Sequence, residues 1–148
     1  MSGIILDTNV LSELMRAQPD AVVLEWFASQ TVAAFYVTAI TRAEILLGIA
    51  LLPAGKRRDA LADASEKMFK EDFPGNCLPF DESCSGLYAS IVAKCRRSGF
   101  AITTEDAQIA AIALHRKLPL ATRNTKDFLN ISGLTLYNPW DVSLLHKS

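Results

Sequence analysis

The sequence has 148 residues, of which 50% are hydrophobic and 21% are charged. This length and composition predict one globular domain over residues 1–148, with a buried core, and exclude a disordered segment. Lys and Arg number 15 against 16 Asp and Glu, for a net charge of -1. The whole molecule therefore has no general attraction for nucleic acid, and any such binding depends on local patches.

Three cysteines, Cys77, Cys84 and Cys95, form no C-x-x-C pair. Their odd number and spacing argue against a disulfide framework and a structural zinc site, so we expect them to pack as small hydrophobic residues. The start "MSGIILD" has no charged segment or long apolar run of the signal-peptide type. The apolar stretch "AEILLGIALLPA" is shorter than the roughly 20 residues that span a bilayer. We expect a cytoplasmic protein that does not enter a membrane.

The first half of the chain alternates short branched runs with helical patterns. Residues 4–6 predict a strand, and "DTNVLSELMRA" predicts a helix from the spacing of its apolar residues. "DAVVLEWFASQ" predicts a second helix, and the aromatic and branched "AFYVTAI" a second strand. "TRAEILLGIALL" predicts a helix over residues 41–52 that is apolar on almost every side. Such a helix is buried or lies in an interface.

The second half continues the alternation. "KRRDALADASEKMFKEDF" predicts a helix, "CLPF" a short strand, and "DESCSGLYASIVAKCRRSG" a helix that Gly99 closes. "TTEDAQIAAIALHRK" predicts a further helix, while "LPLATR" and "LTLYNPW" predict the last two strands. Five strands separated mainly by helices indicate an α/β domain with right-handed crossovers and a mostly parallel sheet.

Acidic and amide residues recur where the predicted strands end. Asp7 follows the first strand, Glu44 comes just after the second, Asp106 opens a helix, and Asn124 and Asp127 follow "LPLATR". Loops at the carboxyl ends of parallel strands meet at one edge of the sheet, where ligands of such folds bind. The sequence therefore predicts an acidic cluster at this edge.

Each acid also has a simpler interpretation as part of a helix cap. Asp7 can cap the next helix, Thr41-x-x-Glu44 has the pattern of a capping box, and Thr103-x-x-Asp106 has a looser one. Caps do not require the acids to converge, however, whereas this topology brings them to one place. Taken together, the acids favour a metal site.

A cluster of carboxylates without His or Cys ligands selects a hard cation, Mg²⁺ or Mn²⁺, which binds phosphate oxygens readily. Hydrolysis of a phosphodiester is the reaction that such a site favours, because the ion orients an attacking water and neutralises charge on the phosphate.

Four segments, "IILDTNVLSE", "ITRAEILLGIALL", "DAQIAAIALHRK" and "LATRNTKDF", occur in the order and near the separations of a known family. They resemble a PIN-domain ribonuclease of the VapC toxin type, and "YNPW" resembles its FitB-like branch. The resemblance implies an α/β/α sandwich with a short, mostly parallel five-stranded sheet. It also implies an RNA-cleaving toxin, a homodimer, and a cognate antitoxin protein as partner.

The resemblance assigns metal binding to Asp7, Glu44 and Asp106, with Asn9 and Thr41 as polar residues that orient the site. We expect one metal ion, held chiefly by Asp7 and Asp106, with Glu44 bound directly or through water. Many relatives have a fourth acid in the loop after the fourth strand. In this loop the chain has Asn124 first and Asp127 three residues later, so either residue could fill the fourth position of the site. Asp127 is counted with the catalytic acids, since one turn of helix would bring both side chains to the same cavity. Arg123 and Lys126 flank the acids in sequence and are candidates for binding the RNA backbone.

Other sites are less favoured by the sequence. His115 and His146 are expected in solvent, and no glycine-rich phosphate loop or G-x-S-x-G elbow is present. An aspartyl phosphatase would need a second Asp where this chain has Asn9. A catalytically silent module of the same fold remains an alternative, although it would not need the acids. Aromatic residues such as Trp140 are expected in the core or an interface.

Overall fold

A computed structural model describes residues 2–32 and 34–141. It contains five short strands, β1 (Gly3–Leu6), β2 (Ala34–Thr38), β3 (Cys77–Leu78), β4 (Leu120–Ala121) and β5 (Leu136–Tyr137). They form one sheet in the order β3-β2-β1-β4-β5, and each neighbouring pair is parallel. The prediction of a mostly parallel five-stranded sheet is confirmed.

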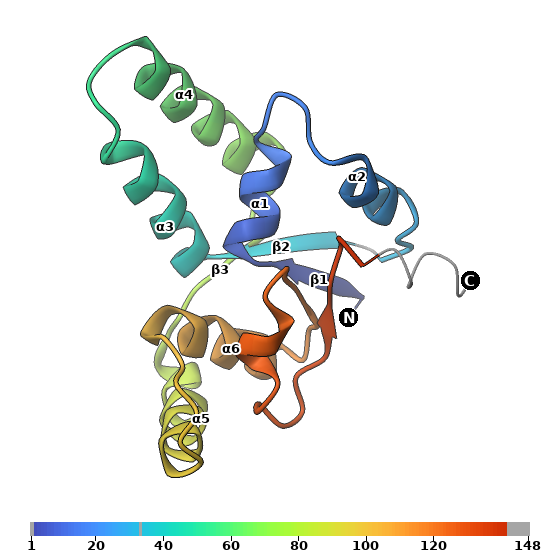
Figure 1. The fold of residues 1–148 in the computed structure, drawn as a ribbon, viewed down its shortest axis with the longest axis vertical. Helices are drawn as coiled ribbons and strands as arrows, with labels where there is room; N and C mark the ends of the chain where they lie inside the picture. The colour runs from blue at the N-terminus through green and yellow to red at the C-terminus, as the bar shows by residue number, and fades with distance from the viewer. Residues whose placement is uncertain (1, 33, 142–148) are drawn as a thin grey trace.

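Helices cover both faces of this sheet. They are α1 (Thr8–Leu14), α2 (Ala21–Ala28), α3 (Ala39–Ala50), α4 (Lys56–Glu71), α5 (Ser85–Arg97) and α6 (Thr104–Arg116), with short 3₁₀ turns η1 (Glu82–Cys84) and η2 (Thr125–Phe128). Figure 1 shows α1 to α4 on one side of the sheet and α5 and α6 on the other. The arrangement confirms the expected α/β/α sandwich.

The central strand β1 separates two hydrophobic cores. Ile5 packs with the helices α5 and α6, whereas Ile4 and Leu6 pack with α1 and α3. This division follows from the alternation of side chains along a strand. All three side chains are at most 1% exposed, which explains why this strand is apolar at every position.

The start of α3 differs from the prediction. The expected capping box began at Thr41, but the helix begins at Ala39 and its cap is Thr38, whose hydroxyl accepts a hydrogen bond from the Thr41 N–H at 3.1 Å. The reason is that β2 ends at Thr38 in extended geometry, so the chain turns directly into the helix. The looser pattern at α6 is confirmed, since the Thr103 hydroxyl accepts from the Asp106 N–H at 3.1 Å.

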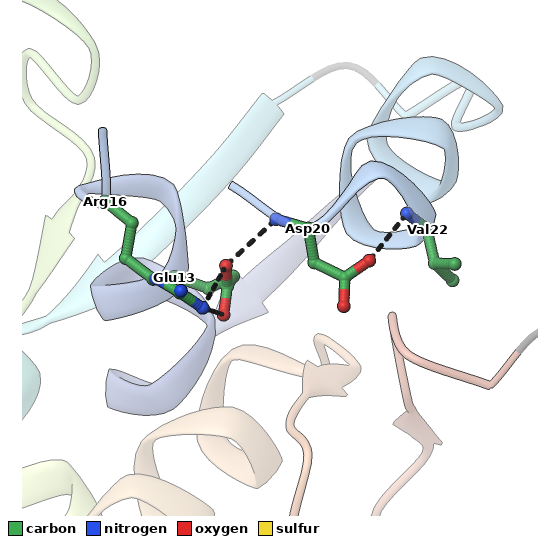
Figure 2. A network of polar contacts seen from close by, with 4 residues as sticks. All are labelled: Glu13, Arg16, Asp20 and Val22. Atoms are coloured by element: carbon green, nitrogen blue, oxygen red, sulfur yellow. Dashed lines mark hydrogen bonds and ion pairs between the residues drawn. The ribbon is translucent and has the colours of Figure 1, made fainter. Parts of the chain in front are cut away.

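The link between α1 and α2 is fixed by a buried carboxylate. Figure 2 shows Glu13, which is 7% exposed, accepting a hydrogen bond from the Asp20 N–H at 2.9 Å. The Asp20 side chain in turn accepts from the Val22 N–H and so caps α2. Arg16 forms an ion pair with Glu13 at 3.2 Å. This network holds α1 in place at the end that is remote from Asp7.

Several smaller predictions can be compared with the structure. Gly99 follows the end of α5 with φ of 71°, as expected for a helix-closing glycine. Cys84 and Cys95 are buried, Cys77 is half-buried, and all three are free thiols. His115 is exposed, whereas His146 lies outside the described residues. None of the helices within the described ranges is long and apolar enough to cross a membrane.

Candidate active site

The candidate site lies at the carboxyl edge of the sheet, where β1 and β4 end side by side. The Asp7 N–H donates to the carbonyl of Ala121 at 2.9 Å, which extends the pairing of the two strands by one residue. Asp7 and Thr122 are therefore held next to each other at the point where their strands become loops.

Asp7 is both a helix cap and a buried acid of the site. One carboxylate oxygen accepts from the Thr8 N–H at 2.9 Å, and the other accepts from the Thr122 hydroxyl at 2.7 Å. The side chain is only 4% exposed. Burial raises the pKa of Asp7 above its usual value of 3.8, although the bonds from Thr122 and Thr8 oppose this change. Asp7 therefore caps α1 with the same carboxylate that the sequence assigns to the predicted metal site.

Glu44 reaches the site from the second turn of α3. The Thr8 hydroxyl donates to Glu44 Oε1 at 2.7 Å and lies 3.1 Å from the Thr41 hydroxyl, with which it shares a hydrogen bond. Thr41 is fully buried, so its position is fixed by the core. These contacts orient Glu44 from α1 and from its own helix.

Asp106 faces these acids from the first turn of α6, on the opposite side of the sheet from α1. The pKa of Asp106 is raised to about 6, first by burial and then by the charge of Asp7, with smaller contributions from Asp127 and Glu44. Such electrostatic coupling requires the carboxylates to be close together. The predicted acids therefore lie within electrostatic range of Asp106.

Asp127 and Asn124, the two candidates for the fourth position, have different surroundings. Asp127 is half-buried in η2, and its charge also raises the pKa of Asp7. Asn124 is exposed and makes no side-chain cap bond, while its N–H donates to the Thr122 hydroxyl at 3.1 Å. The predicted helical turn between Asn124 and Asp127 is present as η2, with the Asp127 N–H donating to the Asn124 carbonyl.

The polar residues around the acids are positioned by their own contacts. The Asn9 amide donates to Thr122 and lies 3.4 Å from Asp7, while its carbonyl accepts from the Arg123 N–H. Arg123 is exposed and lies over the ring of Trp140, and Lys126 is exposed as well.

Thr8 and Thr122 were missed by the sequence prediction. Thr122 lay within the predicted strand "LPLATR", whereas β4 ends at Ala121 and leaves Thr122 at the carboxyl edge. Thr8 directly follows the predicted acid Asp7 and is the first residue of α1. Both hydroxyls orient carboxylates of the site.

The acids of the candidate site have no ion-pair partner among the described residues. Within residues 2–32 and 34–141, the one ion pair joins Arg16 to Glu13, and none involves Asp7, Glu44, Asp106 or Asp127. Negative charge without a partner is unfavourable when buried, and a bound cation would relieve it.

The donor set has the chemistry of a site for Mg²⁺ or Mn²⁺, because all its ligands are carboxylate oxygens. In the same described ranges, however, no three His, Cys, Asp or Glu side chains are already arranged to hold a metal ion. The Glu44 carboxylate accepts a hydrogen bond from Thr8, so we expect the Glu44 side chain to rotate when the acids bind an ion.

A groove leads away from this site. It has a volume of about 1020 Å³ and is lined by residues of α1, α3 and α4, with Thr8 and Glu44 at the site and Arg16 and Arg57 elsewhere along it. Nearby, Leu46 and Leu47 of α3 and Leu51, which caps its end, are 44%, 59% and 76% exposed. The predicted apolar helix thus leaves a large hydrophobic area uncovered.

Comparison with known proteins connects this architecture to a family. The PIN domain matches residues 4–134. A plasmid stability protein named StbB, from Pseudomonas syringae pv. tomato, is 46% identical over 139 residues, which cover 94% of this chain and 99% of the relative. The VapC ribonuclease Y4jK of Sinorhizobium fredii is 42% identical over 138 residues, or 93% of this chain and 98% of the relative.

A solved structure gives the same result. The crystal structure of FitAcB from Neisseria gonorrhoeae superposes with a TM-score of 0.83 at 40% sequence identity, and the match covers 93% of this chain and 98% of that chain. Sequence and fold therefore agree over nearly the whole chain.

Proposed function

The chain belongs to the PIN-domain family, and from this premise we propose that it is an endoribonuclease that depends on Mg²⁺ or Mn²⁺. The observation that carries the proposal is that Asp7 and Glu44 both accept hydrogen bonds from Thr8 at the carboxyl edge of the sheet, where the charges of Asp7, Glu44 and Asp127 also raise the pKa of Asp106. Among the described residues, none of these acids forms an ion pair. The relative named VapC ribonuclease supports the reaction class.

In this proposal Asp7 and Asp106 hold one metal ion, Glu44 binds it directly or through water, and Asp127 adds negative charge from η2. When bound, the ion would supply a polarised water and would neutralise charge on the scissile phosphate. The chain's own polar residues fix this arrangement. Thr122 and Asn9 orient Asp7 at the end of β1, and Thr8 and Thr41 orient Glu44.

The substrate in this proposal is RNA, whose backbone meets the exposed cations Arg123 and Lys126 beside the acids. These cations would offset the repulsion between the acidic cluster and the phosphates. Phosphate contacts of this kind position a nucleic acid without reading its bases.

The alternative of an aspartyl phosphatase is less well supported by the geometry. Such an enzyme uses a second Asp, but the side chain at this place is the amide of Asn9, which is occupied by bonds to Thr122 and the Arg123 N–H. A silent module of the same fold would have no need for buried acids that repel one another, since each unpaired acid is a cost in stability.

We further propose that the protein is the toxin of a toxin–antitoxin pair, acts as a single cytoplasmic domain over residues 1–148, and forms a homodimer. The uncovered leucines of α3 support a protein partner, because soluble monomers rarely expose large apolar areas. Thr8 and Glu44 line the groove beside them, so an antitoxin segment bound there would reach the acids.

The test of the enzymatic proposal is cleavage of labelled RNA by purified variants. Asp7→Asn and Asp106→Asn should each reduce the rate by on the order of a hundredfold or more, because a lost metal ligand costs at least as much as a lost supporting residue. Asp63→Asn, on the exposed surface of α4, is the matched control and should cleave like the wild type. Equal rates for all four proteins would disprove the proposal.

A further inference from the structure

Arg123 directly follows Thr122, whose hydroxyl donates to Asp7. Both the N–H and the carbonyl of Arg123 form hydrogen bonds with side chains. Its N–H donates to the side chain of Asn9 at 3.1 Å, and its carbonyl accepts from the side chain of Asn138 at 3.5 Å. Asn9 also lies beside Asp7, so the backbone of Arg123 is tied to the rim of the acidic cluster.

The side chain of Arg123 is fixed by an aromatic ring from the end of the described chain. Its guanidinium carbon lies 4.8 Å from the centre of the Trp140 ring. Trp140 is half-buried and packs against the core on the side of α1, which holds the ring in place. The backbone N–H of Trp140 donates to the Asn138 side chain at 2.9 Å, so Asn138 links the backbones of Trp140 and Arg123.

The exposure of Arg123 leaves its guanidinium accessible to a ligand. Arg123 is exposed, and within the part of the chain that the structure describes it forms no ion pair. A guanidinium stacked on a ring is held in one plane, while its N–H groups at the edge remain able to donate. Those groups match the oxygens of a phosphate in a bidentate manner.

We propose that Trp140 is a positioning residue: it holds the guanidinium of Arg123, whose backbone is tied to the acidic cluster through Asn9, in place to bind a phosphate of the RNA backbone. This inference rests on the proposed ribonuclease function and adds a residue that the sequence placed only in the core or an interface. Four acids repel an incoming phosphate, so a cation that is fixed beside them favours one position of the backbone.

Binding of a fluorescent single-stranded RNA to metal-free Asp7→Asn protein tests the pair without cleavage. Arg123→Met should weaken binding and lower the slope of log Kd against log salt by about 0.7, the value for one phosphate contact with a single strand. Trp140→Leu should weaken binding by about two- to fivefold, from the usual strength of a partly exposed cation–π contact, and Trp140→Phe should restore part of it. In the Arg123→Met background, Trp140→Leu should have no further effect.

Two controls separate this role from packing. Lys67→Met removes an exposed cation on α4, and Tyr88→Leu removes a half-buried ring on α5, so neither should change the slope. If Trp140 only packs, Trp140→Leu will lower the melting temperature and leave the binding of the folded protein unchanged. If its ring binds a base itself, the loss will persist in the Arg123→Met background. Either result overturns the inference.

Kinetics in the otherwise unchanged protein distinguish this inference from the proposed function. Trp140→Leu should raise KM for RNA by the same two- to fivefold and leave kcat unchanged, because the contact is made equally before and during reaction. If the wild type cleaves RNA and Trp140→Leu has the same KM, the inference is overturned and the ribonuclease proposal stands. Failure of the wild type to cleave RNA with Mg²⁺ or Mn²⁺ would instead overturn the proposed function.

Discussion

At the scale of single residues, the charge of Asp106 links the site to stability. Its pKa is raised to about 6, mainly by burial and by Asp7, so folding favours the protonated form. The resulting stabilisation is present below about pH 4 and is lost as the pH rises through 6. In EDTA, Asp106→Asn should therefore raise the melting temperature at pH 7.5, by about 2–4 °C for each kcal/mol of repulsion relieved, and much less at pH 4.5.

Asp63→Asn controls for the loss of an exposed acid in this measurement. Addition of Mg²⁺ at pH 7.5 should reverse the order, because the ion stabilises the protein that binds it and not the variant. A variant that melts lower than wild type in EDTA at pH 7.5 would show that Asp106 serves the fold and not a cation.

At the scale of elements, Glu13 fixes the start of α2 against α1. Its buried carboxylate accepts from the Asp20 N–H, so Glu13→Ala should leave that donor unsatisfied and destabilise the protein by about 1–3 kcal/mol. Arg16→Ala removes the other, largely exposed partner of Glu13 and should cost at most about 1 kcal/mol. Urea unfolding of both variants measures the difference, and equal effects would contradict this role of Glu13.

The sequence predicted elements better than their ends. The positions of β1 and α6 were predicted correctly, because each has a pattern of apolar residues that matches its buried side chains. The start of α3 was misplaced by two residues, since either Thr38 or Thr41 can cap a helix and only the end of β2 selects between them. Contacts between distant segments, such as the hydroxyl of Thr122 on Asp7, depend on strand register, which local patterns do not determine.

At the scale of the whole molecule, the uncovered face of α3 predicts association. Leu47 and Leu51 are 59% and 76% exposed, so Leu47→Lys with Leu51→Lys should weaken a homodimer or antitoxin complex by adding charge to an apolar contact. Leu24→Lys, at a position on α2 that is 46% exposed, is the matched control. Sedimentation at micromolar concentration should give a dimer for wild type and control, and a monomer for the double variant. A monomeric wild type would contradict the predicted homodimer.

The central claim is that the acidic cluster cleaves RNA through a divalent ion, and removal and return of that ion test it most directly. One preparation of wild-type protein is treated with EDTA, dialysed, and assayed on labelled RNA before and after addition of Mg²⁺ or Mn²⁺. The account predicts no internal cleavage without metal and restored cleavage with it, while Asp106→Asn from the same procedure stays inactive. Cleavage that persists in EDTA, or that Asp106→Asn shows equally after metal is returned, would contradict the account.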